Sequence, residues 1–279
     1  MAEVLKDTLK TIDGYKHMHP HYEELLDILE EVLILREKHR RKVMGDIFNV
    51  DESLIEKKLA GGLPLVDFPE GEFSLEEPRE YFVALLDIAR KRASDETGEI
   101  IQKMENSELN YMEMVRKSFT LQQDEDETGD GSEEEGVFDL LGFLVEESLR
   151  PALEVLSNKY KDVIAGSSWS EGYCPVCGRE PKISEFREEN GKRFLFCGQC
   201  GFEWQFKRVR CPFCGNEDQQ TLAYFTIEEE EKYRVDVCNV CNKYIKAVDF
   251  RKTEKKPNLD VEDIATLHLD ILADEEGYD

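Results

Sequence analysis

The stretch RFLFCGQCGFEWQFKRVRCPFCGN, residues 193–216, combines four cysteines with an alternating row of aromatic side chains. Across the whole chain, eight cysteines form four C-x-x-C pairs: Cys174/Cys177, Cys197/Cys200, Cys211/Cys214 and Cys238/Cys241. The residues that follow these pairs are Gly178, Gly201, Gly215 and Asn242. A residue that tolerates a positive φ at this position suits a tight turn in which two thiolates hold one cation. The pattern therefore predicts four metal-binding knuckles.

Four knuckles can form two four-cysteine sites. Sequential grouping gives the spacings C-x2-C-x19-C-x2-C and C-x2-C-x23-C-x2-C, of which the first is usual for a zinc ribbon and the second is slightly longer. A cross-braced arrangement, in which the first knuckle joins the third, is the open alternative. Because tetrahedral sets of thiolates suit zinc and iron, we expect two metal ions, zinc or iron, each bound by four cysteines.

Two other interpretations of the cysteines fit the chain less well. A thioredoxin-type dithiol is a single C-x-x-C within a strand–helix–strand unit, and no such unit is visible here. A disulfide framework needs an oxidising compartment. The first residues, MAEVLKDTLKTIDGYK, lack the basic and apolar regions of a secretory signal, so we expect a cytoplasmic protein with reduced thiols.

The charge of the chain limits the classes of partner that it can bind. Its 279 residues include 36 Lys and Arg against 62 Asp and Glu, a formal net charge of −26. Residues 172–251 carry 13 basic and 13 acidic side chains, so the negative excess lies outside the cysteine-bearing region. Such a chain repels nucleic acid and anionic membranes, and no apolar run approaches the roughly 18 residues of a membrane helix. We expect no nucleic-acid partner and no membrane insertion, while a homodimer stays open.

The first part of the chain has helical periodicity. Apolar residues at helical spacing predict helices at about residues 22–43, 74–92 and 100–119. Ser74 and Glu77 resemble a capping box at the start of the second helix. The next segment, QQDEDETGDGSEEEG at residues 122–136, is strongly acidic and has no large apolar residue, which predicts a mobile loop.

Helical periodicity resumes at Val137, and Pro151 is expected to kink or divide that helix near Arg150. Close to residue 168 the spacing changes to short strands and tight turns. We therefore predict an α+β multidomain fold. Its parts are an α-helical domain (1–168), two small four-cysteine modules (169–208 and 209–252), and a C-terminal helix with a tail (253–279).

The aromatic side chains beside the second knuckle lie at a spacing of two, as on one face of a strand. Packing beneath the metal sites is the default for such a row, and a docking patch for an apolar peptide is the alternative. Neighbouring basic side chains could orient an acidic partner or offset the charge of four thiolates on a divalent cation. The candidate partner-binding residues are Phe202, Trp204, Phe206, Arg208 and Arg210.

The carboxyl-terminal part resembles a known family. The motifs CPVCGREP, RFLFCGQCGFEWQFKRVRCPFCGN, CNVCNKYIKAVDF and VEDIATLHLD…DEEGY, within residues 172–278, are similar to those of the formate dehydrogenase accessory protein FdhE family. The resemblance implies a helical amino-terminal domain followed by two rubredoxin-like modules whose eight cysteines bind metal. It also implies a cytoplasmic, non-catalytic chaperone that contacts the catalytic molybdenum or tungsten subunit of formate dehydrogenase.

The predicted function is therefore assembly of active formate dehydrogenase, and the protein is expected not to be an enzyme. The sequence contains no G-x-S-x-G, P-loop or H-E-x-x-H motif, in agreement with this expectation. Two alternatives stay open. One is a rubredoxin-like iron protein that transfers electrons, and the other is a nucleic-acid-binding zinc ribbon.

Overall fold

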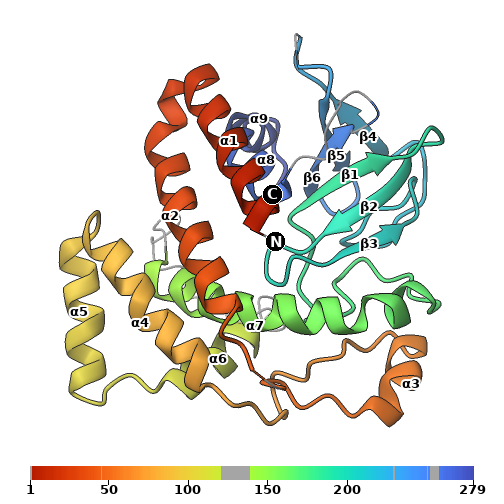
Figure 1. The fold of residues 1–279 in the computed structure, drawn as a ribbon. Coiled ribbons are helices and arrows are strands. Elements are labelled where there is room, and N and C mark those ends of the chain that lie inside the picture. The colour runs from red at the N-terminus through yellow and green to blue at the C-terminus, as the bar shows by residue number, and fades with distance from the viewer. Residues whose placement is uncertain (1, 45, 121–138, 229, 250, 252–257) are drawn as a thin grey trace.

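The computed structural model describes residues 2–44, 46–120, 139–228, 230–249, 251 and 258–279. Figure 1 shows most of the helices on one side of the molecule and the strands on the other, with helix α7 (Leu140–Ala165) running from the helical part to a position below the strands. The acidic segment 122–136, for which the sequence predicts a mobile loop, lies outside the described residues.

The helical part is built around α7, which packs against α2, α4 and α6. The other helices before the sheet are α1 (Ala2–Met18), α2 (Glu23–Arg40), α3 (Ile55–Ala60), α4 (Glu76–Arg90), α5 (Ser94–Glu105) and α6 (Tyr111–Thr120), with 3-10 turns η1 (Pro20–Tyr22) and η2 (Glu52–Leu54). The helix expected at residues 22–43 is confirmed as α2. Its apolar stripe is buried at Leu26, Val32 and Leu33, as the periodicity predicts.

The start of α4 differs from the prediction. Leu75 is the N-cap residue and no side chain caps the helix, so the capping box expected at Ser74 and Glu77 is wrong. The backbone N–H of Ser74 instead donates to the carbonyl oxygen of Ile47 at 3.0 Å. This contact fixes Ser74 in the segment that leads into the helix. It depends on tertiary packing, because Ile47 lies far from Ser74 in the sequence.

Two other helix predictions need correction. The segment 100–119 belongs to two helices, α5 and α6, because the backbone turns at Ser107 with a φ of 59°. Pro151 does not divide α7, which continues through it as one helix. Proline removes one hydrogen-bond donor, but the residues on both sides of it are buried in the core, and this packing holds the helix together.

Six strands form one sheet in the order β3-β2-β1-β6-β5-β4. They are β1 (Ile183–Arg187), β2 (Lys192–Phe196), β3 (Glu203–Phe206), β4 (Leu222–Phe225), β5 (Tyr233–Cys238) and β6 (Tyr244–Asp249). Each cysteine-bearing region contributes three consecutive strands with antiparallel pairing. The two sets meet where β1 runs parallel to β6, with Ile183 opposite Lys246. One continuous sheet therefore connects the two cysteine-bearing regions.

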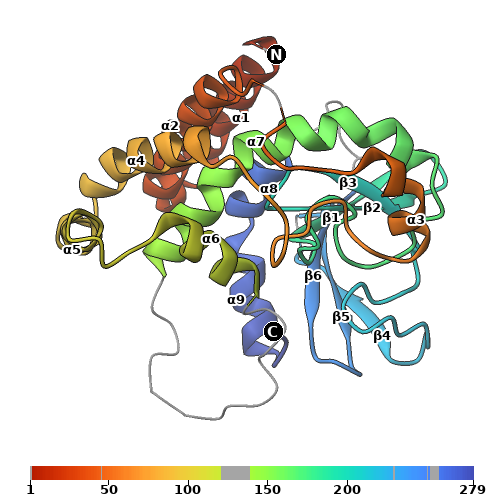
Figure 2. The same cartoon turned by 90° about the horizontal axis from the view of Figure 1, so that it is seen from below.

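The two faces of the sheet belong to different cores, because side chains alternate along each strand. Leu195, Trp204 and Ile245 join the core that contains the helical part. Val235 and Val248 pack in a separate core with Leu259 and Leu269 of the final helices. These helices are α8 (Leu259–Ala265) and α9 (Leu267–Glu275), separated at Thr266, where one helix was expected. Figure 2 shows α9 beside β6, and α8 also packs against α1 and α2.

A buried ion-pair network connects the helical part to α8. Arg36 donates two hydrogen bonds to Glu147, at 2.7 and 2.8 Å, and one to Asp260 at 3.1 Å. Arg150 also donates to Asp260, at 2.9 Å, and the Tyr81 hydroxyl donates to Glu147 at 2.7 Å. Burial lowers the pKa of Arg36, but the surrounding carboxylates more than offset this effect, so the pKa is raised well above its ordinary value. Arg36 is therefore a fixed positive charge that holds α2, α7 and α8 together.

We expect Arg36→Met to destabilise the fold by about 3–5 kcal/mol, because it leaves the Glu147 carboxylate buried without its bidentate partner. The matched control is Arg41→Met, at the end of the same helix, where the Arg41 side chain is 57% exposed and pairs with Glu37. That change is expected to cost less than about 1 kcal/mol. Urea unfolding followed by circular dichroism measures both values. Similar small losses for the two variants would contradict the role assigned to the network.

Candidate metal centres

All four C-x-x-C segments fold into the same turn. In each, the N–H of the first cysteine donates to the carbonyl oxygen five residues later, and the N–H four residues later donates back to that cysteine's carbonyl oxygen. These bonds measure 2.8–3.1 Å. The residue after each second cysteine has a positive φ: Gly178 79°, Gly201 68°, Gly215 74° and Asn242 55°. The predicted knuckle geometry is confirmed, including asparagine in the place of glycine.

The knuckles meet in sequential pairs. One cluster contains Cys174, Cys177, Cys197 and Cys200, and the other contains Cys211, Cys214, Cys238 and Cys241. We name them the first and the second cluster. Within each, all four sulfur atoms lie within 4.8 Å of one another, so the sequential grouping is confirmed and the cross-braced alternative is excluded.

The sulfur separations fit coordination better than disulfide bonding. The closest pairs are Cys174–Cys200 at 3.3 Å and Cys177–Cys197 at 3.4 Å in the first cluster. In the second cluster, Cys211–Cys241 and Cys214–Cys238 are each 3.7 Å apart. A disulfide requires about 2.05 Å, whereas four sulfurs around zinc at about 2.3 Å lie about 3.8 Å from one another. All eight cysteines are free.

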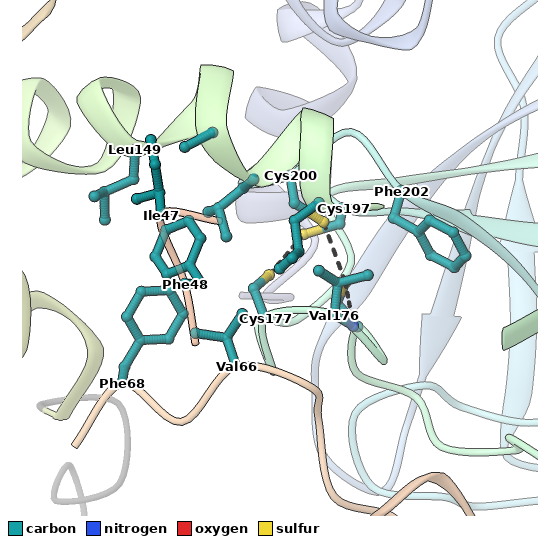
Figure 3. Packing of buried hydrophobic residues seen from close by; sticks show 14 of the residues in the cluster. Ile47, Phe48, Val66, Phe68, Leu149, Val176, Cys177, Cys197, Cys200 and Phe202 are labelled. Atoms are coloured by element: carbon teal, nitrogen blue, oxygen red, sulfur yellow. Dashed lines mark hydrogen bonds between the residues drawn. The ribbon is translucent and has the colours of Figure 1, made fainter. Parts of the chain in front are cut away.

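The first cluster lies inside the main core. Its four cysteines are at most 4% exposed, and Figure 3 shows Cys177, Cys197 and Cys200 beside Val66 and Phe202, beneath α7. The segment that follows α3 makes backbone hydrogen bonds to the first knuckle. Leu65 N–H donates to Pro175 O at 2.9 Å, and Val66 N–H donates to Val176 O at 3.0 Å. The helical part therefore encloses this cluster.

The second cluster reaches the surface. Cys211 and Cys238 are buried, but Cys214 is exposed and Cys241 is partly exposed. The knuckles also carry exposed apolar side chains, since Val209 is 39% exposed and Val240 is 59% exposed. The two clusters thus have the same local fold and different surroundings.

The electrostatics of the first cluster favour a bound cation. Burial raises the pKa of Cys174 and of Cys200 well above the ordinary value of a thiol. Burial acts on Cys197 in the same direction, but hydrogen bonds from the other three cysteines outweigh it and lower the pKa of Cys197 well below the ordinary value. Four thiolates cannot be buried together without a compensating positive charge. These residues could therefore hold a metal ion that takes four sulfur ligands.

One thiol of the second cluster, that of Cys238, has a lowered pKa. Partial burial raises the pKa of Cys238, but backbone N–H groups of Cys241 and Val240 outweigh it, and the Asn216 side chain also donates to this sulfur. The resulting pKa is about 7. N–H groups pointing at sulfur are a feature of metal knuckles, so the donor set of the second cluster also fits a metal ion.

The aromatic row is buried, as its default interpretation of packing predicts, and the alternative docking patch is not formed by these rings. Phe202 is 9% exposed, Trp204 4% and Phe206 5%, and the indole N–H of Trp204 donates to the carbonyl oxygen of Glu171 at 3.1 Å. A surface patch made of these three rings is ruled out in this fold, because they pack in the main core. Of the five candidate partner residues, only Arg208 and Arg210 reach the surface.

A large cavity that the sequence analysis did not predict lies where the helical part meets the first cysteine-bearing region. It has a volume of about 710 Å³, and its walls include Leu25, Ile28 and Phe143. Leu25 is 42% exposed and Phe143 is 38% exposed. Periodicity identified Leu25 as apolar, but a cavity formed by several separate segments leaves no local signal in the sequence.

The fold and the two clusters define a helical protein joined to a mixed sheet that carries two four-cysteine metal-binding clusters. Two protein-family models match it: FdhE, central domain, at residues 173–208, and FdhE, C-terminal domain, at residues 209–279. A Protein FdhE homolog of Aquifex aeolicus is 29% identical over 275 residues, which cover 97% of this chain and 90% of the relative. Residues 173–279 therefore carry the central and C-terminal domains of the FdhE family.

Other relatives match a smaller part of the chain. A Protein FdhE homolog of Pseudomonas aeruginosa is 30% identical over 156 residues, covering 51% of this chain and 50% of the relative. Protein FdhE of Escherichia coli O157:H7 is 34% identical over 109 residues, covering 38% and 34%. The crystal structure of the FdhE protein from Pseudomonas aeruginosa has the same fold. Its TM-score is 0.67 at 19% identity, covering 96% of this chain and 90% of that chain.

The helices in the described part of the chain were also tested for membrane crossing. None of them is both long enough and apolar enough to span a bilayer.

The unequal burial of the clusters predicts two rates of metal release. With a chromogenic chelator in excess, the second cluster should lose its metal first, because Cys214 is exposed, whereas release from the first cluster requires opening of the core. Absorbance of the chelator complex should therefore show two phases of equal amplitude. In a Cys214→Ser variant the fast phase should be altered and the slow phase unchanged. A single phase for the unmodified protein would contradict this assignment.

Proposed function

We propose that this chain is a non-catalytic accessory protein of the cytoplasm, needed to produce active formate dehydrogenase. The proposal rests on the matches of residues 173–279 to the FdhE family models and on the resemblance of the cysteine motifs to those of the formate dehydrogenase accessory protein. Its partner would be the catalytic molybdenum or tungsten subunit. The eight cysteines would bind two metal ions, zinc or iron, and the two cysteine-bearing regions would act as rubredoxin-like modules.

The observation that carries the proposal is the opposite exposure of two clusters with the same knuckle geometry. Metal in the first cluster would stabilise the core that joins the helical part to the sheet. Metal in the second cluster would fix two surface knuckles at one end of the same sheet, where Cys214 is exposed. A surface fixed before binding loses little conformational entropy on association, which favours recognition of a folded partner.

The proposed contact surface surrounds the second cluster. Val209 and Val240 are exposed apolar side chains on its knuckles, and Arg208 is an exposed cation immediately before one of them. Apolar groups flanked by arginine are typical of protein interfaces. This surface replaces the buried aromatic row as the proposed site for the catalytic subunit.

Electron transfer is a second candidate function, and the exposure of Cys214 and Cys241 favours it. Iron held by four thiolates can change its oxidation state, and exposed ligands shorten the path to a redox partner. Elemental analysis of protein isolated under strict anoxia tests this function. Zinc in both clusters, with no visible absorbance, would rule it out.

Co-purification with a tagged catalytic subunit tests the accessory function. We expect the double variant Cys211→Ala, Cys214→Ala to lose the complex, because the second cluster would no longer fix the contact surface. Circular dichroism should still show the helical part, since the first cluster is intact. Retention of the subunit with unchanged affinity would reject the proposed surface.

A matched pair of valines makes the test independent of metal loss. Val240, which is 59% exposed on a knuckle, and Val83, which is 51% exposed on α4, are replaced by serine in separate variants. Val240→Ser is expected to weaken the complex about tenfold, as loss of a buried apolar contact at an interface would. Val83→Ser should leave the affinity unchanged. Equal effects would show that the contact lies elsewhere.

A further inference from the structure

A second cavity, of about 250 Å³, lies beside the second cluster. Its walls come from β2, β4 and β5 and from the knuckle that begins at Cys211. Two of the cluster's own cysteines, Cys211 and Cys238, contribute to its lining. The exposed Tyr224, with 62% of its surface accessible, forms part of one wall.

The charge of this cavity is opposite to the charge of the chain. Five basic side chains and one carboxylate line it: Arg193, Arg208, Arg210, Arg234, Lys243 and Asp236. The whole chain has a formal net charge of −26. A divalent metal in the second cluster would leave two negative charges on its four thiolates. Two of the five basic side chains also have carboxylate partners outside the lining, since Arg210 lies 3.8 Å from Glu217 and Lys243 lies 3.3 Å from Glu180. Arg193, Arg208 and Arg234 therefore share Asp236 and the cluster as their counter-charges.

Two nitrogen atoms of the buried Arg193 guanidinium have no hydrogen-bond partner among the described residues. Arg193 is 3% exposed, and its Nη1 group donates to the carbonyl oxygen of Arg210 at 3.2 Å. Its Nη2 lies 3.4 Å from a carboxylate oxygen of Asp236, outside hydrogen-bond geometry, and its Nε has no hydrogen-bond partner among the described residues.

Asp236 is shared with a second guanidinium, since Arg234 Nε lies 2.8 Å from its other oxygen. The guanidinium groups of Arg208 and Arg234 lie over the same ring, at 5.2 and 4.2 Å from the centre of Phe186. Apart from this ring contact, the Arg208 side chain makes no hydrogen bond or ion pair within the described part of the chain. Several guanidinium groups thus converge on one space, and N–H groups of Arg193 and Arg208 have no acceptor there among the described residues.

We propose that this cavity binds the phosphate group of a small molecule. The oxygens of a phosphate dianion accept paired N–H bonds from guanidinium groups, and Arg193 and Arg208 have N–H groups without an acceptor among the described residues. A single carboxylate has fewer acceptor oxygens and half the charge of the dianion. The cavity is larger than one phosphate group, and the exposed ring of Tyr224 offers a flat surface for the rest of the ligand.

Calorimetric titration of the metal-loaded full chain tests the proposal with phenyl phosphate, inorganic phosphate and benzoate. We expect phenyl phosphate to bind more tightly than inorganic phosphate, and benzoate to bind at least about tenfold more weakly than either. All binding should weaken as the salt concentration rises. Benzoate binding as tight as that of phenyl phosphate would overturn the proposal, as would the absence of saturable phosphate binding in the millimolar range.

Two variants adjacent in the chain separate the cavity from general electrostatic attraction. Arg208→Gln removes a lining charge, whereas Lys207→Gln removes an exposed charge that pairs with Glu217 and does not line the cavity. We expect Arg208→Gln to weaken phenyl phosphate binding about tenfold and Lys207→Gln to change it less than about twofold. Equal weakening by the two variants would overturn the proposal.

Arg234→Gln provides a second test that does not disturb the buried Arg193, whose replacement could prevent folding. It too should weaken phenyl phosphate binding. Tetraglutamate serves as the competitor that represents an acidic peptide. If it displaces phenyl phosphate at lower concentration than inorganic phosphate does, the cavity recognises acidic peptide and the small-molecule proposal fails.

Discussion

Burial of four thiols in one hydrophobic core is the constraint on which this structure depends. The first cluster is enclosed by α7, by the segment after α3 that contains Val66, and by the first three strands. Sulfur atoms at this density favour a cation, because burial opposes ionisation of thiols that have no positive charge beside them. The four cysteines of the first cluster are therefore part of the hydrophobic core, and this core joins the helical part to the sheet.

The two clusters have the same local structure in different surroundings. Both use knuckles with the same pair of backbone hydrogen bonds and a positive φ after the second cysteine. The first is covered by the helical part, whereas Cys214 of the second is exposed. Exposure permits metal exchange, electron transfer or contact with a partner, while burial restricts a cluster to stabilising the fold. The parallel pairing of β1 with β6 makes the two clusters parts of one rigid sheet.

Charge is also divided between parts of the molecule. The negative excess lies outside the cysteine-bearing region, and basic side chains converge beside the second cluster. Inside the molecule, the network around Arg36 compensates its charges with carboxylates at 2.7–3.1 Å. In the second cavity, by contrast, Arg193 lies 3.4 Å from Asp236, and two of its nitrogen atoms have no hydrogen-bond partner among the described residues. This contrast distinguishes a charge cluster that stabilises the fold from one suited to binding an anion.

The sequence by itself determined the features that depend on neighbouring residues. It identified the knuckles, the need for Gly178 or Asn242 at a positive φ, and the apolar stripe of α2, because turn geometry and helical periodicity are local. It favoured the sequential grouping of the cysteines, but only the structure excluded the cross-braced one. Tertiary structure decided which face of a strand is covered and which segments meet. It buried Trp204, held α7 together through Pro151, and brought Arg193 of β2 close to Asp236 of β5. Such contacts depend on the packing of whole elements, and this packing has no counterpart in the spacing of residues along the chain.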